Sequence, residues 1–363
     1  MKNVCLIVSN QIGVFGETDC GALSVFENAG YPFSEIRLLR TLNEEEISRA
    51  VADCKHVGEN LVILVYGYAV SAVLSAVSKG FSKEFIPVTP EGAGILDDAE
   101  KTLFLLSYQD EEFVRQVCLP HLAHKYGQRI GAVVFRFIGV DGGRMDAVLS
   151  KAENLSGGRA YIRSANKHGE DVIRVFYDEN TPRMLTDDLA RLFAEELSDN
   201  LYALEDTTLE KQLIQLLRLR GKKLCVAESF TAGGIAKRIV SVPGASDVYF
   251  EGVNTSADQA KMQRLGVTEF TLRSQGAVSE QTAYEMAAGL LQQGNCNVSI
   301  ATTGLAGPNG DGMGTPIGSC FIAIGIDESV YVYRYVLEGD RQEITETAIS
   351  YALFLACKRL KNM

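Results

Sequence analysis

The chain has 363 residues, about 2.4 times a typical domain length of roughly 150, so two or three domains are expected. Apolar residues make up 46% and charged residues 22%, which is ordinary globular usage and excludes a mostly disordered chain. The net charge of −11 and the pI near 5.0, without any Lys- or Arg-rich run, argue against nucleic-acid binding. The apolar runs are shorter than the roughly 20 residues that span a bilayer, and the N-terminus lacks a signal-peptide pattern. We therefore expect a cytoplasmic protein with no membrane partner.

The eight cysteines occur singly, and the four histidines are scattered among them. Because no Cys-x-x-Cys pair is present, zinc and iron–sulfur patterns are missing, and we interpret the cysteines as small buried hydrophobes. His121 and His124 have a spacing that would place both on one helix face. Two such ligands without a partner carboxylate do not make a metal site, so no metal is predicted.

The first segment, residues 1–127, alternates strands with helices. The run 60–66 is apolar without alternation, which indicates a strand covered on both faces. The acidic residues 44–46 suit the first turn of a helix that runs to Cys54. This order of elements predicts a parallel α/β sheet. The other predicted elements are strands over 4–8, 35–39 and 102–106, a glycine-bearing loop over 9–21 and a proline-containing loop over 85–93.

Residues 128–204 are predicted to form a small α+β unit. Its strands are expected over 131–137, 160–164 and 171–177, and its helices over 145–154 and 186–197. The loop 139–144 between the first strand and helix is interpreted as a tight turn. A third domain, 205–363, then opens with Thr207 and Glu210, which have capping-box spacing, on a helix that Gly221 ends.

The third domain carries the chemically informative residues. A buried strand over 224–227 runs into the turn 228–234, and a helix over 235–242 follows. Such a turn exposes a side chain at the carboxyl end of a sheet, so Ser229 lies where a nucleophile would, although serine there is more often a plain helix cap. A second buried strand, 298–302, ends in the glycine-bearing loop 303–308, where glycine permits close approach of a ligand.

Two further stretches accompany these turns. Residues 276–279 are expected to cap a helix over 280–291. Residues 257–261, which include Lys261, are expected to start a helix after a strand through Tyr249 and Phe250. An isolated lysine is normally a solvated surface charge.

Six ordered motifs in this domain resemble the CinA carboxyl-terminal domain, the nicotinamide-nucleotide amidase family. Residues before 205 are similar to the rest of a full-length CinA. The resemblance implies a three-layer α/β molybdopterin-binding-like domain, a small α+β KH-like domain and an α/β CinA carboxyl-terminal amidase domain. The motifs are Ala227-Glu228-Ser229 with Thr231 and Gly233, Pro243-Gly244-Ala245-Ser246, Ala260-Lys261, Gly276-Ala277-Val278-Ser279, Thr303-Gly304 with Ala306-Gly307-Pro308, and Gly339-Asp340-Arg341.

The resemblance implies that a homodimer hydrolyses the carboxamide of nicotinamide mononucleotide to nicotinic acid mononucleotide and ammonia, without a cofactor. Ser229 would be the nucleophile, Lys261 its general base and Thr303 a further active-site hydroxyl. A neutral lysine activates a serine where burial lowers the lysine pKa. The implied oxyanion hole consists of backbone N–H groups near Phe230 and Gly304. The implied substrate-binding residues are Glu228, Thr231, Gly233, Gly304, Ala306, Gly307 and Arg341, of which Arg341 would lie near the phosphate.

The third domain departs from the family pattern at three positions. Ser256 replaces a tyrosine five residues before the lysine, Ala232 replaces a glycine of the nucleophile turn, and Thr345 replaces a second basic residue after Arg341. Ala232 blocks close backbone approach if the turn requires a positive φ. The alternative function is therefore a non-catalytic pyridine-nucleotide-binding or regulatory protein.

The first domain departs further. Of the family's glycine-rich loop only Gly67 remains, within residues 65–72, and Ser9-Asn10-Gln11 replaces a Gly-Thr-Glu loop. A phosphate cradle without its glycines and a metal site without its carboxylates are not expected to work. We therefore predict a scaffold or dimerisation role without a divalent metal, and residual pyrophosphatase activity is the third hypothesis.

Overall fold

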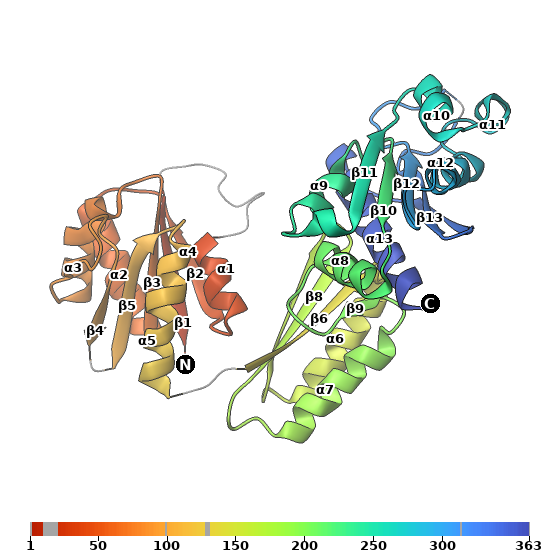
Figure 1. Ribbon diagram of the computed structural model, residues 1–363. Helices are drawn as coiled ribbons and strands as arrows, with labels where there is room; N and C mark the ends of the chain where they lie inside the picture. Colours follow the sequence, from red (N-terminus) through yellow and green to blue (C-terminus); the bar gives the residue numbers. More distant parts are fainter. Residues whose placement is uncertain (1, 10–20, 99, 128–130, 313, 363) are drawn as a thin grey trace. The chain divides into compact units, whose positions relative to one another are not determined.

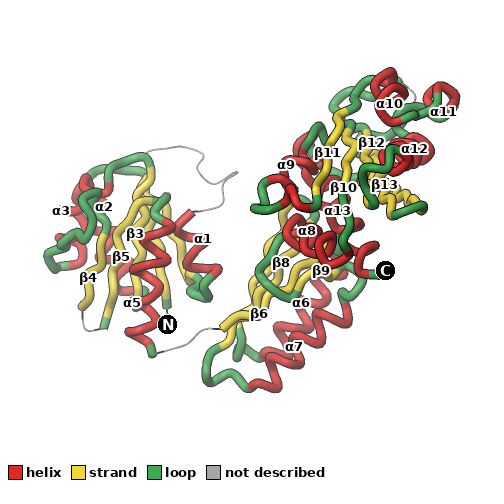
Figure 2. Tube along the Cα trace, viewed as in Figure 1, coloured by secondary structure: helices red, strands yellow, loops and turns green. Residues whose placement is uncertain are grey.

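A computed structural model describes residues 2–9, 21–98, 100–127, 131–312 and 314–362 (Figures 1 and 2). The predicted loop over 9–21 and the replaced motif at Asn10-Gln11 lie outside these residues, apart from their flanking positions. The chain forms two compact units, one of 1–132 with 159–161 and 176–182, the other of 133–158 with 162–175 and 183–363. The predicted boundary at 204/205 lies inside the second unit, so the division into three domains stays a prediction.

The first unit contains a five-stranded sheet in the order β2-β1-β3-β5-β4. Four strands are parallel, as predicted, and β4 adds an antiparallel edge that the sequence pattern did not reveal. The strands are β1 (Asn3–Ser9), β2 (Phe33–Leu39), β3 (Asn60–Tyr66), β4 (Gly94–Asp98) and β5 (Lys101–Ser107).

Helices cover both faces of this sheet. Successive side chains of a strand point to opposite faces, and those of β1 and β3 are apolar on both, so both faces must be buried. On β1, Val4 and Leu6 pack with α2 and α3, whereas Cys5 and Ile7 pack with α1 and α5. The result is a three-layer arrangement. The helical elements are α1 (Gly21–Asn28), α2 (Glu44–Val57), η1 (Val70–Val73), α3 (Leu74–Phe81), α4 (Glu111–Phe113), η2 (Val114–Cys118) and α5 (Leu119–Tyr126).

The segment after residue 130 forms a four-stranded sheet in the order β7-β8-β6-β9, accompanied by α6 and α7 (Figure 1). The predicted turn 139–144 is partly the start of α6, because the Asp141 side chain caps the helix by accepting from the Arg144 N–H. β9 was not predicted, since three residues carry too little pattern. The elements are β6 (Gly131–Ile138), α6 (Gly142–Ser156), β7 (Tyr161–Lys167), β8 (Glu170–Tyr177), α7 (Arg183–Glu196) and β9 (Leu201–Ala203).

The C-terminal sheet has the order β11-β10-β12-β13-β14. α8, α9 and α13 cover one face, and α10 and α12 cover the other. Its strands are β10 (Leu224–Glu228), β11 (Tyr249–Asn254), β12 (Val298–Gly304), β13 (Ser319–Ile326) and β14 (Ser329–Val336). Its helices are α8 (Leu209–Arg220), α9 (Gly234–Val240), η3 (Ala245–Asp247), α10 (Asp258–Leu265), α11 (Glu269–Ser274), α12 (Glu280–Gln292) and α13 (Arg341–Lys361).

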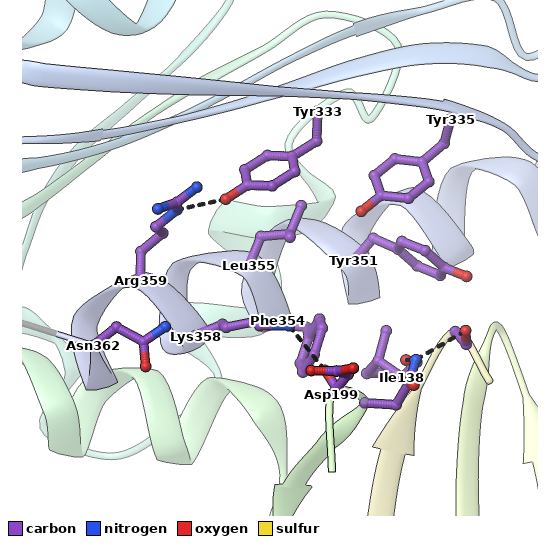
Figure 3. A pocket seen from close by; sticks show the side chains of 12 residues that line it. Ile138, Asp199, Tyr333, Tyr335, Tyr351, Phe354, Leu355, Lys358, Arg359 and Asn362 are labelled. Carbon is purple, nitrogen blue, oxygen red and sulfur yellow. Dashed lines mark hydrogen bonds between the residues drawn. The ribbon is translucent and has the colours of Figure 1, made fainter. Parts of the chain in front are cut away.

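A cavity of about 520 Å³ lies where β14 and α13 meet the end of β6 and the turn before β9 (Figure 3). None of the helices in the described ranges is long and apolar enough to cross a membrane. The seven cysteines that the structure describes are free and buried, as predicted, and Cys20 lies outside the described residues.

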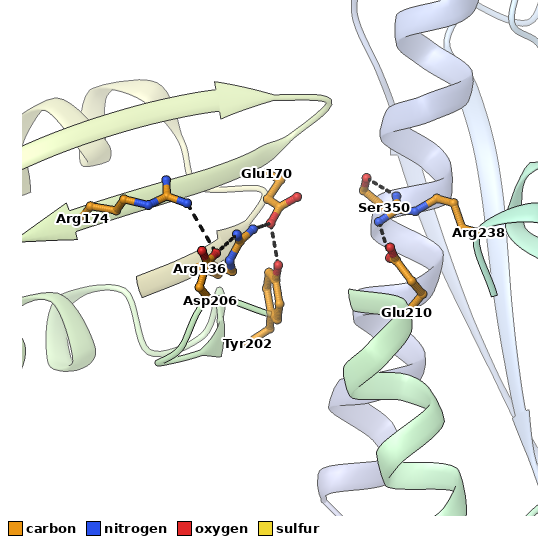
Figure 4. A network of polar contacts seen from close by, with 8 residues as sticks. All are labelled: Arg136, Glu170, Arg174, Tyr202, Asp206, Glu210, Arg238 and Ser350. Carbon is orange, nitrogen blue, oxygen red and sulfur yellow. Dashed lines mark hydrogen bonds and ion pairs between the residues drawn. The ribbon is translucent and has the colours of Figure 1, made fainter. Parts of the chain in front are cut away.

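The predicted capping box of Thr207 and Glu210 is wrong. α8 begins after Thr208, whose side chain makes no cap hydrogen bond. The Glu210 carboxylate instead accepts from Arg238 Nη2 at 2.8 Å, and Arg238 Nη1 donates to Ser350 Oγ at 3.0 Å (Figure 4). Glu210 is therefore used to tie α8, α9 and α13 together.

A second polar network in Figure 4 fixes the connection that leads into α8. Arg136 Nη1 of β6 donates to the Glu170 carboxylate at 2.8 Å, and Arg136 also pairs with Asp206. Arg174 reaches the same Asp206 carboxylate at 3.4 Å. The connecting segment is thus anchored by charge to the sheet that precedes it.

The turn between β10 and α9 requires left-handed backbone at two successive residues. Gly233 has φ +93° and Ala232 has φ +51°. An L-residue in the left-handed region costs roughly 1–2 kcal/mol, whereas glycine adopts it freely. The Ala232 N–H donates to the Ser229 carbonyl at 3.3 Å, and the Gly234 N–H donates to the Thr231 carbonyl at 2.9 Å, which holds the turn in this form. The family glycine that Ala232 replaces is therefore at a position of positive φ.

We expect Ala232→Gly to raise the free energy of unfolding by about 1 kcal/mol, because it relieves the left-handed strain. Urea titration followed by circular dichroism measures the change. The matched control is Ala147→Gly on the exposed side of α6, which should lower stability by roughly 0.5–1 kcal/mol. A loss of stability at both positions would contradict the assignment of strain to Ala232.

Candidate active site

The register of β10 and β12 brings Ser229 level with Thr303. The two strands are parallel, with Ala227 opposite Ala301, and the Ser229 N–H donates to the Thr302 carbonyl at 3.1 Å. Ala227 and Ala301 pack with α12, so residues two positions further on face the same side of the sheet. Ser229 and Thr303 therefore share the α12 face at the carboxyl edge of neighbouring strands.

Lys261 reaches this edge from α10. Its side chain is 1% exposed, and its Nζ lies 3.3 Å from Ser229 Oγ. Nζ also donates to the carbonyls of Thr255 and Ser256, both at 2.9 Å. Burial lowers the pKa of Lys261 below the ordinary 10.5, and only the charge of Asp258 opposes that shift.

These three contacts fit a neutral amine as well as an ammonium. A neutral amine has two N–H donors and one lone pair. With both donors taken by the carbonyls of Thr255 and Ser256, the lone pair is left to accept the hydroxyl proton of Ser229. The arrangement is that of a serine paired with a lysine base.

Two backbone N–H groups are available beside Ser229. The Phe230 N–H has no acceptor among the residues that the structure describes. In the antiparallel ladder of β12 and β13, the Leu305 N–H donates to the Ser319 carbonyl. Hydrogen-bonded and non-hydrogen-bonded pairs alternate along such a ladder, so the next pair, Gly304 and Cys320, exchanges no hydrogen bonds. The Gly304 N–H therefore faces the β10 side of β12, where β10 has already ended.

Gly304 also leaves no room for a side chain. A Cβ there would lie 2.8 Å from the Phe230 ring and 2.8 Å from Cys320 Cβ. The Thr303 hydroxyl donates to the Ala277 carbonyl at 2.5 Å, and Ser279 caps α12 as predicted by accepting from the Thr282 N–H. Thr303 therefore ties the end of β12 to the loop before α12, and among the described residues its hydroxyl makes no hydrogen bond to Ser229 or Lys261.

Glu228 and Thr231 use their side chains inside the protein. The Glu228 carboxylate, 1% exposed, accepts from the N–H groups of Gly233, Ile235 and Ala236 at 3.0, 3.1 and 2.9 Å. Thr231 Oγ1 lies 2.7 Å from Thr302 Oγ1. Both groups fix the turn and α9, and their contact with a substrate stays a prediction.

Arg341 lies at the first turn of α13, beside the glycine loop. Its Nη1 donates to the Gly307 carbonyl at 2.6 Å, and the side chain is otherwise exposed. Ala306 is buried with Phe230 and Cys320. The hydroxyl of Thr345, at the position of the missing basic residue, donates to the Arg341 carbonyl at 2.7 Å.

Two contacts of this site have no signal in the sequence. The carbonyls of Thr255 and Ser256 hold Lys261, and any residue would supply them. The side chain of Ser256, where the family has tyrosine, is exposed. The hydrogen bond between Thr231 and Thr302 could have been predicted, because both residues lie near the carboxyl ends of two strands that the sequence identifies.

No group of three or more His, Cys, Asp or Glu side chains in the described ranges is placed to hold a metal. The cavity of about 520 Å³ shares no residue with the site around Ser229. The chemistry-bearing pair and the cavity are therefore separate features of this unit.

The chain is similar to proteins whose names describe competence-damage inducible proteins. Residues 206–360 match the family described as the CinA C-terminal domain. A relative from Clostridium acetobutylicum, whose name describes a competence-damage inducible protein, is 31% identical over 276 residues, which is 74% of this chain and 67% of that protein. A relative of the same name from Caldicellulosiruptor saccharolyticus is 28% identical over 338 residues, or 86% of this chain and 80% of that protein.

A solved structure of a competence-damaged protein (CinA) superfamily member from Enterobacter cloacae is 36% identical, with 44% of this chain and 97% of that chain covered at a TM-score of 0.42. The two relatives are matched over most of this chain, and the C-terminal family is matched over 206–360. The chain therefore belongs to the CinA family.

Proposed function

We propose that the site hydrolyses the carboxamide of nicotinamide mononucleotide to nicotinic acid mononucleotide and ammonia. The observation that carries the proposal is the Ser229–Lys261 pair, 3.3 Å apart, with the lysine buried between two carbonyls. The substrate comes from the resemblance to the amidase family, and the pair supplies the chemistry that an amide requires.

In the proposed reaction, Ser229 Oγ attacks the carboxamide carbon while its proton passes to Lys261 Nζ. The N–H groups of Phe230 and Gly304 stabilise the oxyanion, each donor being worth about 3 kcal/mol. The Lys261 ammonium then protonates the departing nitrogen, which leaves as ammonia, and a nicotinoyl ester remains on Ser229. Water, deprotonated by Lys261, attacks the ester and releases the carboxylate, and the proton returns to Ser229.

The remaining assignments belong to the same proposal. Among the described residues, only the Nη1 donor of Arg341 has a partner, the Gly307 carbonyl, so we assign the other donors to a phosphate. The serine–lysine scheme is complete without a cofactor, and we propose a homodimer by resemblance. The strained turn at Ala232 and the replacements at Ser256 and Thr345 favour one alternative, a protein that binds the nucleotide without turnover.

Ser229→Ala and Lys261→Met should each lower ammonia release from nicotinamide mononucleotide by about a hundredfold or more. Ser229→Ala removes the nucleophile, and Lys261→Met keeps the length of the side chain but removes the base. The control is Lys211→Met, an exposed lysine on α8, which should leave the rate unchanged. If the unmodified chain and all three variants bind the nucleotide but release no ammonia, the alternative without turnover is favoured.

The rate should depend on pH through Lys261. Because the neutral amine is the base, kcat/KM rises as the pH rises through the lysine pKa, which lies below 10.5. Asp258→Asn removes the charge that favours the ammonium, so it should move the acid limb of the profile to lower pH. A limb that stays in place or moves to higher pH would argue against Lys261 as the titrating group.

Glu228→Gln separates a structural role from substrate binding. One amide oxygen cannot replace a carboxylate that accepts three backbone N–H groups, so the free energy of unfolding should fall by about 2 kcal/mol. Urea titration and the KM for nicotinamide mononucleotide are measured together. A raised KM with unchanged stability would assign Glu228 to the substrate instead.

A further inference from the structure

The cavity of about 520 Å³ has the size and the lining of a small-molecule site. Tyr333 and Tyr335 reach into it from β14, and Tyr351 and Phe354 reach into it from α13 (Figure 3). Tyr335 and Tyr351 pack edge to face, with ring centroids 4.7 Å apart. Four aromatic rings therefore offer faces and edges on which a planar ring can stack.

Polar groups converge on the same space. Among the described residues, the hydroxyls of Tyr335 and Tyr351 have no hydrogen-bond partner. Burial raises the pKa of Tyr335 to about 12, and burial raises that of Tyr351 as well, so both hydroxyls keep their protons and remain donors. Asn362 adds a side-chain amide at the edge of the cavity.

The charged residues that line the cavity carry a net positive charge. Lys358 and Arg359 are the two cations, and Asp199 is the one carboxylate in the described lining. This contrasts with the chain as a whole, whose net charge is −11. Basic residues in the last turn of α13 also offset the helix dipole, but that role requires no aromatic cavity beside them.

The cations are already positioned by neighbours that leave donors free. Arg359 Nε donates to the Tyr333 hydroxyl at 2.5 Å, and the guanidinium lies 3.7 Å from the centroid of Tyr331. Among the residues that the structure describes, Nη1 and Nη2 of Arg359 make no hydrogen bond. Lys358 Nζ donates one hydrogen to the Asp199 carbonyl at 3.0 Å. An acidic group in the cavity would meet donors that neighbouring residues already hold in place.

Hydrogen bonds hold the wall of the cavity that the end of β6 forms. Asn200 Nδ2 donates to the carbonyls of Ile138 and Gly139 at 2.7 and 3.0 Å. A Cβ at Gly139 would lie 2.5 Å from the Tyr351 hydroxyl oxygen, so glycine allows the closest approach of this wall to the ring. The cavity is therefore shaped by the end of β6 as well as by β14 and α13.

We propose that this cavity binds a small planar aromatic compound that carries an acidic group, the class to which nucleoside monophosphates belong. The ring stacks among Tyr335, Tyr351 and Phe354, and the acidic group pairs with Arg359 and Lys358. The site is distinct from the one around Ser229 and does not depend on the amidase activity.

The chain contains no tryptophan, so Phe354→Trp places a single indole reporter in the aromatic wall. Phe354 also borders a neighbouring cavity of about 290 Å³, which gives the larger ring room. AMP should change the indole emission saturably, and adenosine and inorganic phosphate should each bind about tenfold more weakly or worse. In the same background, Arg359→Gln should weaken AMP binding by about tenfold, and the exposed control Arg220→Gln should not.

No saturable change with AMP up to millimolar concentration overturns the proposal, as does equal binding of AMP and adenosine or indifference to Arg359→Gln. A nucleotide bound only near Ser229 leaves the indole emission unchanged and overturns the proposal as well. Because Phe354→Trp changes one of the proposed stacking rings, calorimetric titration of the unmodified chain with AMP is carried out in parallel, and absence of binding there overturns the proposal. Tyr335→Phe, which removes one donor but keeps the ring, should then weaken binding several-fold, and unchanged binding overturns the assignment.

Discussion

The buried carboxylate of Glu228 determines how the chain leaves β10. By accepting from three N–H groups at the start of α9, it offsets the cost of burying a charge and fixes the direction of that helix. Because side chains alternate along a strand, fixing Glu228 on the α13 face places Ser229 on the α12 face. The left-handed turn through Ala232 and Gly233 follows, since the backbone must reverse within a few residues to present these N–H groups.

The rest of the site is assembled around this turn. Arg238 ties α9 to Glu210 of α8 and to Ser350 of α13, so the helix that Glu228 orients cannot rotate freely. On the opposite face, α10 carries Lys261 to Ser229, and the loop before α12 receives the Thr303 hydroxyl. The site thus joins contacts from both faces of one sheet edge.

Much of this fold follows from local patterns in the sequence. β3, β10 and β12 are apolar runs covered on both faces, and Ser279 is a typical N-cap residue for α12. These four elements were therefore predicted within a few residues. α13 was not predicted, because its apolar residues surround the helix instead of forming one stripe, although Asp340 and Glu343 form the capping box that starts it. The capping box predicted for Thr207 and Glu210 does not form, because the Glu210 carboxylate pairs with the Arg238 guanidinium, which is remote in sequence.

In the candidate site, too, some residues were identified from the sequence and some contacts were not. Ser229, Lys261 and Thr303 were identified by motif, and the structure brings the first two into contact while Thr303 bonds to Ala277. Glu228 was assigned to the substrate by motif, and its carboxylate accepts from three N–H groups at the start of α9, so its contact with a substrate stays a prediction. The carbonyls that hold Lys261 belong to every residue type, so no pattern of side chains could have disclosed them.

That last feature bears on how the family can diverge. A base that is held by backbone carbonyls depends on the path of the chain through 255–256 and not on which side chains stand there. Position 256, whose side chain is exposed, is therefore free to exchange residues during evolution as long as the backbone keeps its course, and the serine found there in place of tyrosine keeps the carbonyl that holds Lys261. Selection on such a site acts on chain geometry, so sequence drift beside the lysine is a poor guide to whether its anchoring has been lost.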